Sequence, residues 1–132
     1  MQKIFILLFV LFSCAQAQNS VTDTAQELQW LDTKDMQKFN GIWKLANSYC
    51  KALHAAQKDD WRLPTKKELQ HLGESKKLKA KFRYLDTALY WSKDIDKSSD
   101  GFNAYTVYTG NGFISSTDKC NTNKLVCVRK LQ

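Results

Sequence analysis

The segment from Asp59 to Leu69 constrains the fold of this chain more than any other stretch. It holds a large aromatic residue, Trp61, and Pro64, the only proline among the 132 residues. Pro64 disfavours helical backbone at the residue before it. Thr65 then starts a helix, because Glu68 three residues later completes the capping-box pattern of a helix N-terminus. The segment therefore predicts a fixed turn that closes a loop and begins a helix.

Two interpretations of the block Asp60-Trp61-Arg62 are open at this point. In the first, the block is structural, with Trp61 in the core between helix and sheet. Arg62 then pairs with Asp60, with Glu68 or with backbone carbonyls. In the second, the block is a binding site, where Trp61 stacks on a sugar and Arg62 pairs with the acid of that sugar. We favour the first, because a capping box fixes the backbone here and says little about ligand contact.

The apolar spacing before this segment predicts a helix from Ile42 to about Gln57, with Asn40 as a suitable cap. Intervals of three and four residues place its apolar side chains on one face. Cys50 belongs to that inward face. A second, shorter helix follows the capping box and ends at Gly73. The apolar positions of the first helix are Ile42, Leu45, Ala46, Tyr49, Cys50 and Leu53.

Short apolar or alternating runs predict a small, mostly antiparallel sheet that packs on the two helices. Gly110-Asn111-Gly112 is a strong hairpin turn. The polar residues from Gln18 to Thr24 are expected to fray, and Lys34 to Asn40 to form a loop. The predicted strands are Glu27–Leu31, Leu89–Ser92, Ala104–Tyr108, Phe113–Ser116 and Leu125–Arg129.

Residues 1–17 have the pattern of a secretory signal peptide, which leaves residues 18–132 as a single domain. An apolar run from Ile4 to Phe12 follows a positive start and precedes the small-residue site Ala15-Gln16-Ala17. The run is too short to cross a bilayer, which takes about 20 residues. We therefore expect an exported protein, periplasmic or extracellular, without a transmembrane segment. The alternative is a lipoprotein anchored through Cys14, since the residues around it resemble a bacterial lipoprotein cleavage box.

The chain is basic, and this bears on its partners. Its net charge of +7 becomes +6 when Lys3 leaves with the signal peptide, which holds no acidic residue. Such a charge favours acidic polysaccharides, phospholipid head groups or nucleic acid, and export argues against nucleic acid.

The densest positive region begins in the second predicted helix and continues through Glu74 to Arg83, a stretch expected to be a loop or a frayed helix. The alternative to a binding face is a solvated charged surface with no ligand. As an anion-binding face, the region offers point charges and guanidinium forks for sulfate, carboxylate or phosphate. The candidate residues are Lys66, Lys67, Lys76, Lys77, Lys79, Lys81 and Arg83.

The sequence contains little that indicates a catalytic or a metal-binding site. His54 and His71 are the only histidines, and neither has a nucleophile partner visible in the sequence. Zinc takes three or four convergent nitrogen or sulfur ligands, which this chain does not supply. The loop with Asp94, Asp96 and Asp100 superficially resembles a calcium loop, but lysines interrupt it and the bidentate glutamate is missing. We therefore expect a protein that is not an enzyme and has no metal or cofactor.

Three cysteines remain after export: Cys50, Cys120 and Cys127. An oxidising compartment favours at least one disulfide, and the odd number leaves one thiol over. Composition and spacing do not decide which two are paired.

Five motifs in order carry a resemblance to a known family: Trp30, the Trp43-x-x-Ala46-x-x-Tyr49-Cys50-x-x-Leu53 helix, the Asp60-Trp61-Arg62-Leu63-Pro64-Thr65-x-x-Glu68-Leu69 block, Tyr90-Trp91-Ser92, and Cys127-Val128-Arg129. This pattern resembles the DUF1566 family, the Lcl C-terminal domain (Legionella collagen-like protein C-terminal domain), from about Thr22 to Lys130. The resemblance implies a compact α+β fold, distantly similar to C-type lectin-like domains.

That resemblance implies a disulfide from a helix to the last strand, which here corresponds to Cys50 and Cys127. Cys120 departs from the family pattern, either as a free thiol or as an intermolecular bridge, and it competes as a partner for Cys50. The paired active-site cysteines of the distant formylglycine-generating enzymes are not evident, so that activity is not carried over. The residues expected to form the structural motif are Asp60, Trp61, Arg62, Leu63, Pro64, Glu68, Trp91 and Arg129.

The combined expectation is a secreted or envelope-associated bacterial binding module without enzymatic activity. Adhesin domains of the resembled family bind glycosaminoglycans through a basic surface, so an anionic polysaccharide or an envelope protein is the expected partner. The alternative is a structural or assembly subunit of an envelope complex with no glycan ligand.

Overall fold

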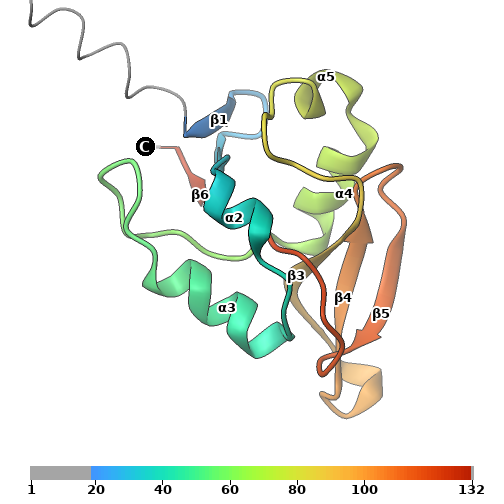
Figure 1. The fold of residues 1–132 in the computed structure, drawn as a ribbon. Helices are drawn as coiled ribbons and strands as arrows, with labels where there is room; N and C mark the ends of the chain where they lie inside the picture. Colours follow the sequence, from blue (N-terminus) through green and yellow to red (C-terminus); the bar gives the residue numbers. More distant parts are fainter. Residues whose placement is uncertain (1–18, 132) are drawn as a thin grey trace, which may run out of the picture.

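The computed structural model describes residues 19–131. The expected signal peptide, its cleavage site and the alternative anchor Cys14 lie outside the described residues. The described chain has two small sheets with helices around them (Figure 1). The α+β fold class expected from the sequence is confirmed, with two three-stranded antiparallel sheets in place of one.

The first sheet joins the two ends of the described chain. Its strands are β1 (Ser20–Asp23), β2 (Leu28–Leu31) and β6 (Val128–Lys130), with β2 in the centre. β1 corrects the expectation of a frayed start: Val21 pairs with Trp30, and both side chains are buried. One buried apolar residue in a polar run is a weak signal, and pairing with β2 is what makes this segment a strand.

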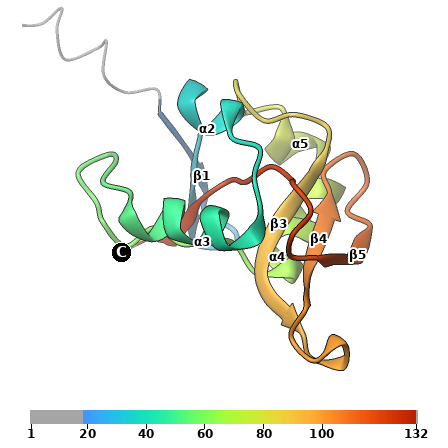
Figure 2. The same cartoon turned by 60° about the horizontal axis from the view of Figure 1, so that its bottom comes forward.

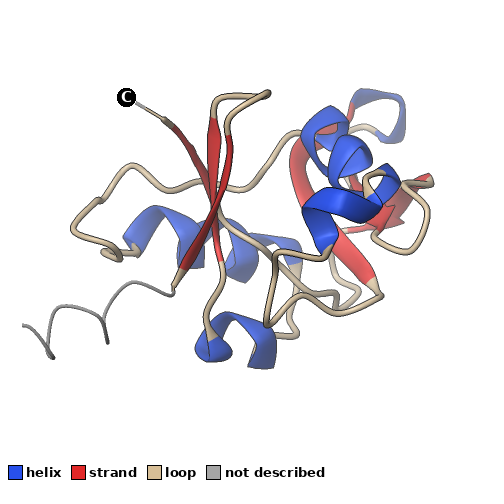
Figure 3. Cartoon of the chain, turned by 90° about the horizontal axis from the view of Figure 1, so that it is seen from above, coloured by secondary structure: helices blue, strands red, loops and turns tan. Residues whose placement is uncertain are grey.

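The second sheet consists of β3 (Leu89–Asp96), β4 (Asn103–Tyr108) and β5 (Ile114–Asp118), with β4 in the centre. β3 runs farther than predicted, through a register shift between Trp91 and Ile95. Asp94 and Asp96 are therefore strand residues, and Asp100 follows the short 3₁₀ helix Lys97–Ser99. Figure 3 shows the two sheets as separate groups of red strands, with the helices between and beside them.

The longer helices are α3 (Trp43–Ala52) and α4 (Lys66–Glu74). α4 begins as predicted, with a complete capping box between Thr65 and Glu68. α3 has Ile42 as its N-cap, with no side-chain cap hydrogen bond, and ends before the predicted Gln57. Leu45, expected on the inward face, is 57% exposed, whereas Ala46 and Cys50 are buried.

Two short helices occupy segments for which a loop, and a loop or a frayed helix, were predicted. α2 (Lys34–Lys38) replaces the expected loop, and the side chain of Thr33 caps it by accepting the N–H of Met36. α5 (Lys76–Lys79) lies in the basic run, where Leu78 is its buried anchor. Each buries a single residue, so apolar periodicity could not reveal either helix.

The C-terminal segment connects the two sheets. Figure 2 shows it in dark red, passing from β5 across β3 and on towards α3 and β6. Gly41 and Asn123 exchange backbone hydrogen bonds, and Trp91 N–H donates to the Lys124 carbonyl. The expected disulfide is confirmed: Cys50 of α3 is bonded to Cys127, and Cys120 is an exposed free thiol. Cys127 precedes β6, which is shorter than the predicted last strand.

Candidate binding sites

The Asp60-Trp61-Arg62 block is held by internal contacts. Trp61 is 2% exposed, and its indole N–H donates to the Ala55 carbonyl at 3.1 Å. Arg62 donates to both carboxylate oxygens of Glu68, at 2.8 and 3.0 Å, and to the neighbouring Leu63 carbonyl at 3.2 Å. The arginine and its partner lie over the first turn of α4, so the pair fixes the entry to that helix.

Glu68 is both a cap and a counter-ion. Its Oε1 accepts the backbone N–H of Thr65 at 2.8 Å, in addition to the bond from Arg62. Burial acts to raise the pKa of Glu68, but the hydrogen bonds and charge of Arg62 and the bonds from Thr65 outweigh it, so the pKa is lowered. The ionised carboxylate is therefore the form that this part of the fold stabilises.

Asp60 pairs with an arginine from the far end of the chain. Arg129 is 4% exposed, and it donates to the two Asp60 oxygens at 2.6 and 3.2 Å. It also donates to Gln29 of β2 at 2.7 Å. The hydrogen bond from Arg129 is the main cause that lowers the pKa of Asp60. Trp91, from the second sheet, is fully buried and donates its indole N–H to the Gly41 carbonyl at 2.9 Å.

The seven basic residues of the run do not form one group. Lys79 faces inward: its Nζ donates to the carbonyls of Gly73, Thr109 and Gly110 at 2.7, 2.8 and 3.3 Å. The Nζ of Lys66 lies 3.8 Å from the ring centroid of Tyr105. The other five are exposed, and within residues 19–131 no ion pair involves them: Lys67, Lys76, Lys77, Lys81 and Arg83.

A small hollow beside α5 brings two of these lysines together. Lys77 and Lys81 line a space of about 230 Å³ with His71 and the β1–β2 connection. Asp23, at the end of β1, lies in the same hollow and is 3.8 Å from His71 Nε2. Its carboxylate places a negative charge next to the lysines, so the hollow itself is less suited to an anion than the exposed lysines around it.

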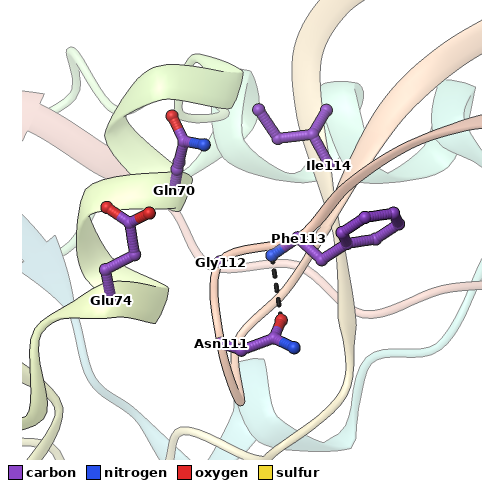
Figure 4. Close-up of a pocket in the computed structure, with 6 residues that line it drawn as sticks. All are labelled: Gln70, Glu74, Asn111, Gly112, Phe113 and Ile114. Carbon is purple, nitrogen blue, oxygen red and sulfur yellow. Dashed lines mark hydrogen bonds between the residues drawn. The ribbon is translucent and has the colours of Figure 1, made fainter.

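A second hollow, of about 440 Å³, lies between α4 and the β4–β5 turn (Figure 4). Gln70 and Glu74 extend from the helix, and the ring of Phe113 points away from them. The turn packs so closely on α4 that a Cβ on Gly73 would lie 2.7 Å from Gly112 Cα. Gly112 itself has a φ of 82°, which favours glycine. With an exposed carboxylate at Glu74 and no basic residue in its lining, this hollow does not suit an anion.

A third hollow, of about 400 Å³, was not predicted from the sequence; we name it the α3 groove. Its residues come from α3, from the Arg62–Leu63 segment and from β3, so no local pattern connects them. The only available sequence signal was the spacing within the α3 helix, which places its three members on one face. The groove is lined by Trp43, Asn47, Lys51, Arg62, Leu63 and Lys93.

Residues 19–131 contain no group of three or more His, Cys, Asp or Glu side chains placed to hold a metal ion. His54, two residues after the end of α3, is exposed. Over the same residues, none of the helices has the length and apolar character needed to span a bilayer.

The two small sheets, the helices around them and the disulfide from α3 to the residue before β6 form a C-type-lectin-like α+β fold. The crystal structure of botrocetin is similar, with a TM-score of 0.54 and 12% sequence identity over 86% of this chain and 98% of that chain. At this identity, the similarity establishes the fold alone. Comparison with curated protein sequences gave no match.

The family follows from the sequence match. The sequence model of the Lcl C-terminal domain family matches residues 19–129. The chain therefore belongs to the Lcl C-terminal domain family, as the resemblance indicated.

Proposed function

We propose that this protein is an exported, non-enzymatic binding module for anionic polysaccharide. The observation that supports it best is the set of five exposed basic residues on and after α4 and α5 that have no ion-pair partner in residues 19–131. Unpaired surface cations attract sulfate and carboxylate groups, with a strength that falls as salt is added. A binding role also fits the domain family and the lectin-like fold.

The test is retention on heparin, a sulfated polysaccharide, compared with retention on a plain sulfonate cation exchanger. The triple variant Lys76→Glu/Lys77→Glu/Lys81→Glu should elute from heparin at much lower salt than the wild type. Lys79 is left unchanged because its charge is used inside the fold. The matched control is Lys34→Glu/Lys44→Glu/Lys58→Glu, which reverses three other exposed lysines.

Each outcome bears on the proposal. A larger loss of heparin retention for the first triple variant than for the control supports a binding face at α4–α5. Equal losses in the two triple variants would mean that net charge alone explains heparin retention, and would contradict the proposal. Equal retention of the wild type on heparin and on the exchanger would have the same meaning.

A second candidate function is that of an assembly subunit, favoured by three neighbouring apolar side chains at one end of the second sheet. Leu89 pairs with Tyr108, and the N–H of Tyr108 donates to the Phe113 carbonyl. Their exposed fractions are 36%, 37% and 66%. Exposed apolar clusters of this kind mark interaction surfaces. A complex with an envelope protein that dissociates in Tyr108→Ser/Phe113→Ser, with heparin retention unchanged, would favour this function over the first.

A further inference from the structure

The α3 groove combines a fixed aromatic side chain with free cations. Trp43, Asn47 and Lys51 are spaced by four residues on α3, so they form one wall. Its volume of about 400 Å³ lies within the range of small-ligand sites.

The walls of the groove are held by backbone and side-chain hydrogen bonds. The indole N–H of Trp43 donates to the Ser92 carbonyl of β3 at 2.9 Å, which fixes the ring against the second sheet. The N–H of Lys93 donates to the Pro64 carbonyl at 2.8 Å. Arg62 and Val128 exchange backbone hydrogen bonds at 2.9 and 2.8 Å. The groove is therefore formed before any ligand arrives, which lowers the entropy cost of binding.

The charges in the groove are positive, and two of them are available to a ligand. Arg62 is already neutralised by Glu68. Lys51 and Lys93 are exposed, and neither takes part in an ion pair within the described chain. Lys119 adds a third cation at the aromatic side chain, with its Nζ 4.6 Å from the Trp43 ring centroid. No carboxylate is among the lining residues.

We infer that the α3 groove binds one acidic sugar ring, a pyranose that carries a carboxylate or a sulfate. The apolar face of the ring packs on Trp43, as aromatic side chains provide large apolar contact with defined geometry. The acid lies between Lys51 and Lys93 as a charge-assisted hydrogen-bond acceptor. The Asn47 amide, which both donates and accepts hydrogen bonds, binds the hydroxyl groups of the sugar ring. This inference rests on the proposed function and adds a specific site, built from residues outside the lysine run.

The test is a titration with the trisaccharide of galacturonic acid, followed by Trp fluorescence and by calorimetry. We expect saturable binding of one trisaccharide to the wild type, with a change in indole emission that Trp43→Phe abolishes. Lys51→Glu and Lys93→Glu should each weaken binding by about tenfold or more, since each removes a charge-assisted contact. The control Lys44→Glu reverses an exposed lysine of the same helix that does not line the groove, and it should change affinity by less than about twofold.

Three results would overturn the groove as the site. They are equal weakening by Lys44→Glu and Lys51→Glu, equally tight binding of a neutral galactose trisaccharide, and displacement by inorganic sulfate at the concentration of the trisaccharide. A thermal melt of each variant separates loss of the site from loss of the fold.

Different results would refute the α3 groove and the lysine run as binding sites. If heparin retention is lost in Lys76→Glu/Lys77→Glu/Lys81→Glu but the trisaccharide does not bind in the groove, the proposed function stands and the groove inference is wrong. If the wild type binds neither heparin nor the trisaccharide more strongly than its net charge explains, both the proposed function and the groove inference are wrong.

Discussion

The Asp60–Glu68 segment and the lysine run that follows it share helix α4, yet they use charge in opposite ways. In the segment, Arg62 and Asp60 each have a partner, at 2.8 Å and 2.6 Å. In the run, none of the seven cations has an ion-pair partner among the described residues, and only Lys79 and Lys66 have another partner, carbonyl oxygens for Lys79 and the Tyr105 ring for Lys66. The difference shows that the number of charges in a segment does not indicate whether they stabilise the fold or are available to a ligand. The presence or absence of a partner for each charge does indicate it.

This contrast also separates lysines of one short helix. Lys77 and Lys79 are two residues apart in α5, but Lys79 holds three carbonyls from α4 and the β4–β5 connection, whereas Lys77 is exposed. We call the frame the residues that are held by partners inside the fold: the pairs Arg62–Glu68 and Asp60–Arg129 and the disulfide Cys50–Cys127. Lys79 extends the frame into the run.

The largest effect is expected from removing the covalent part of the frame. Cys50→Ala/Cys127→Ala opens a loop of 77 residues and should lower the free energy of unfolding by about 4 kcal/mol. Denaturant unfolding under oxidising conditions measures it. Cys120→Ala, which removes an exposed free thiol, should leave stability unchanged. A comparable loss in both variants would mean that the disulfide contributes nothing particular to the frame.

The second effect concerns the buried arginine of the frame. Arg129→Met removes hydrogen bonds to Asp60 and Gln29 and should cost roughly 2 kcal/mol. The cost stays below that of a fully buried pair because the side chain of Asp60 is 48% exposed and can be hydrated. Thermal melts compare it with Lys130→Met, an exposed neighbour that should shift the melting temperature little. Equal shifts would contradict the assignment of Arg129 to the frame.

The third effect tests the two interpretations of the central block. Arg62→Ala removes a bidentate bond to a partly buried carboxylate and should cost about 1–2 kcal/mol. Arg83→Ala is the matched control, since it is exposed and has no ion pair in the described chain. If Arg62→Ala melts like the wild type but loses anion binding, Arg62 belongs to a binding site instead of the frame.

The smallest effect is the pH dependence of the same pair. The pKa of Glu68 is lowered from its ordinary value of 4.5, so the ionised form is favoured in the folded state. Its contribution is complete above that value and is lost as the pH falls through the lowered pKa. The stability difference between the wild type and Glu68→Gln should therefore shrink between about pH 5 and the acid limit. A difference that stays constant with pH would show that the charge of Glu68 does not matter.

The parts of the fold that depend on local pattern were accessible from the sequence. The capping box at Thr65, the inward face at Cys50 and the turn at Gly110–Gly112 each follow from a few consecutive residues. The disulfide partner of Cys50 came from the family resemblance, because three cysteines leave several pairings open.

The parts of the fold and of the candidate sites that depend on partners distant in the chain could not be predicted from the sequence. β1 needs β2 beside it, and Asp60 is 69 residues from the arginine that holds it. The inward role of Lys79 depends on carbonyls 30 and 31 residues farther along the chain. The α3 groove is likewise assembled from three separate segments. Spacing within one segment carries no information on such contacts.

Replacing Lys77 and Lys79 of α5 one at a time tests most directly whether partnered cations stabilise the fold and unpartnered cations bind anions. Lys77→Met and Lys79→Met each remove one charge, and both the melting temperature and the salt needed to elute from heparin are measured. We expect Lys79→Met to lower the free energy of unfolding by about 1–2 kcal/mol with little specific loss of heparin retention. Lys77→Met should melt like the wild type and elute at lower salt than Lys79→Met. If the two variants change both quantities equally, the division between paired and unpaired cations is wrong.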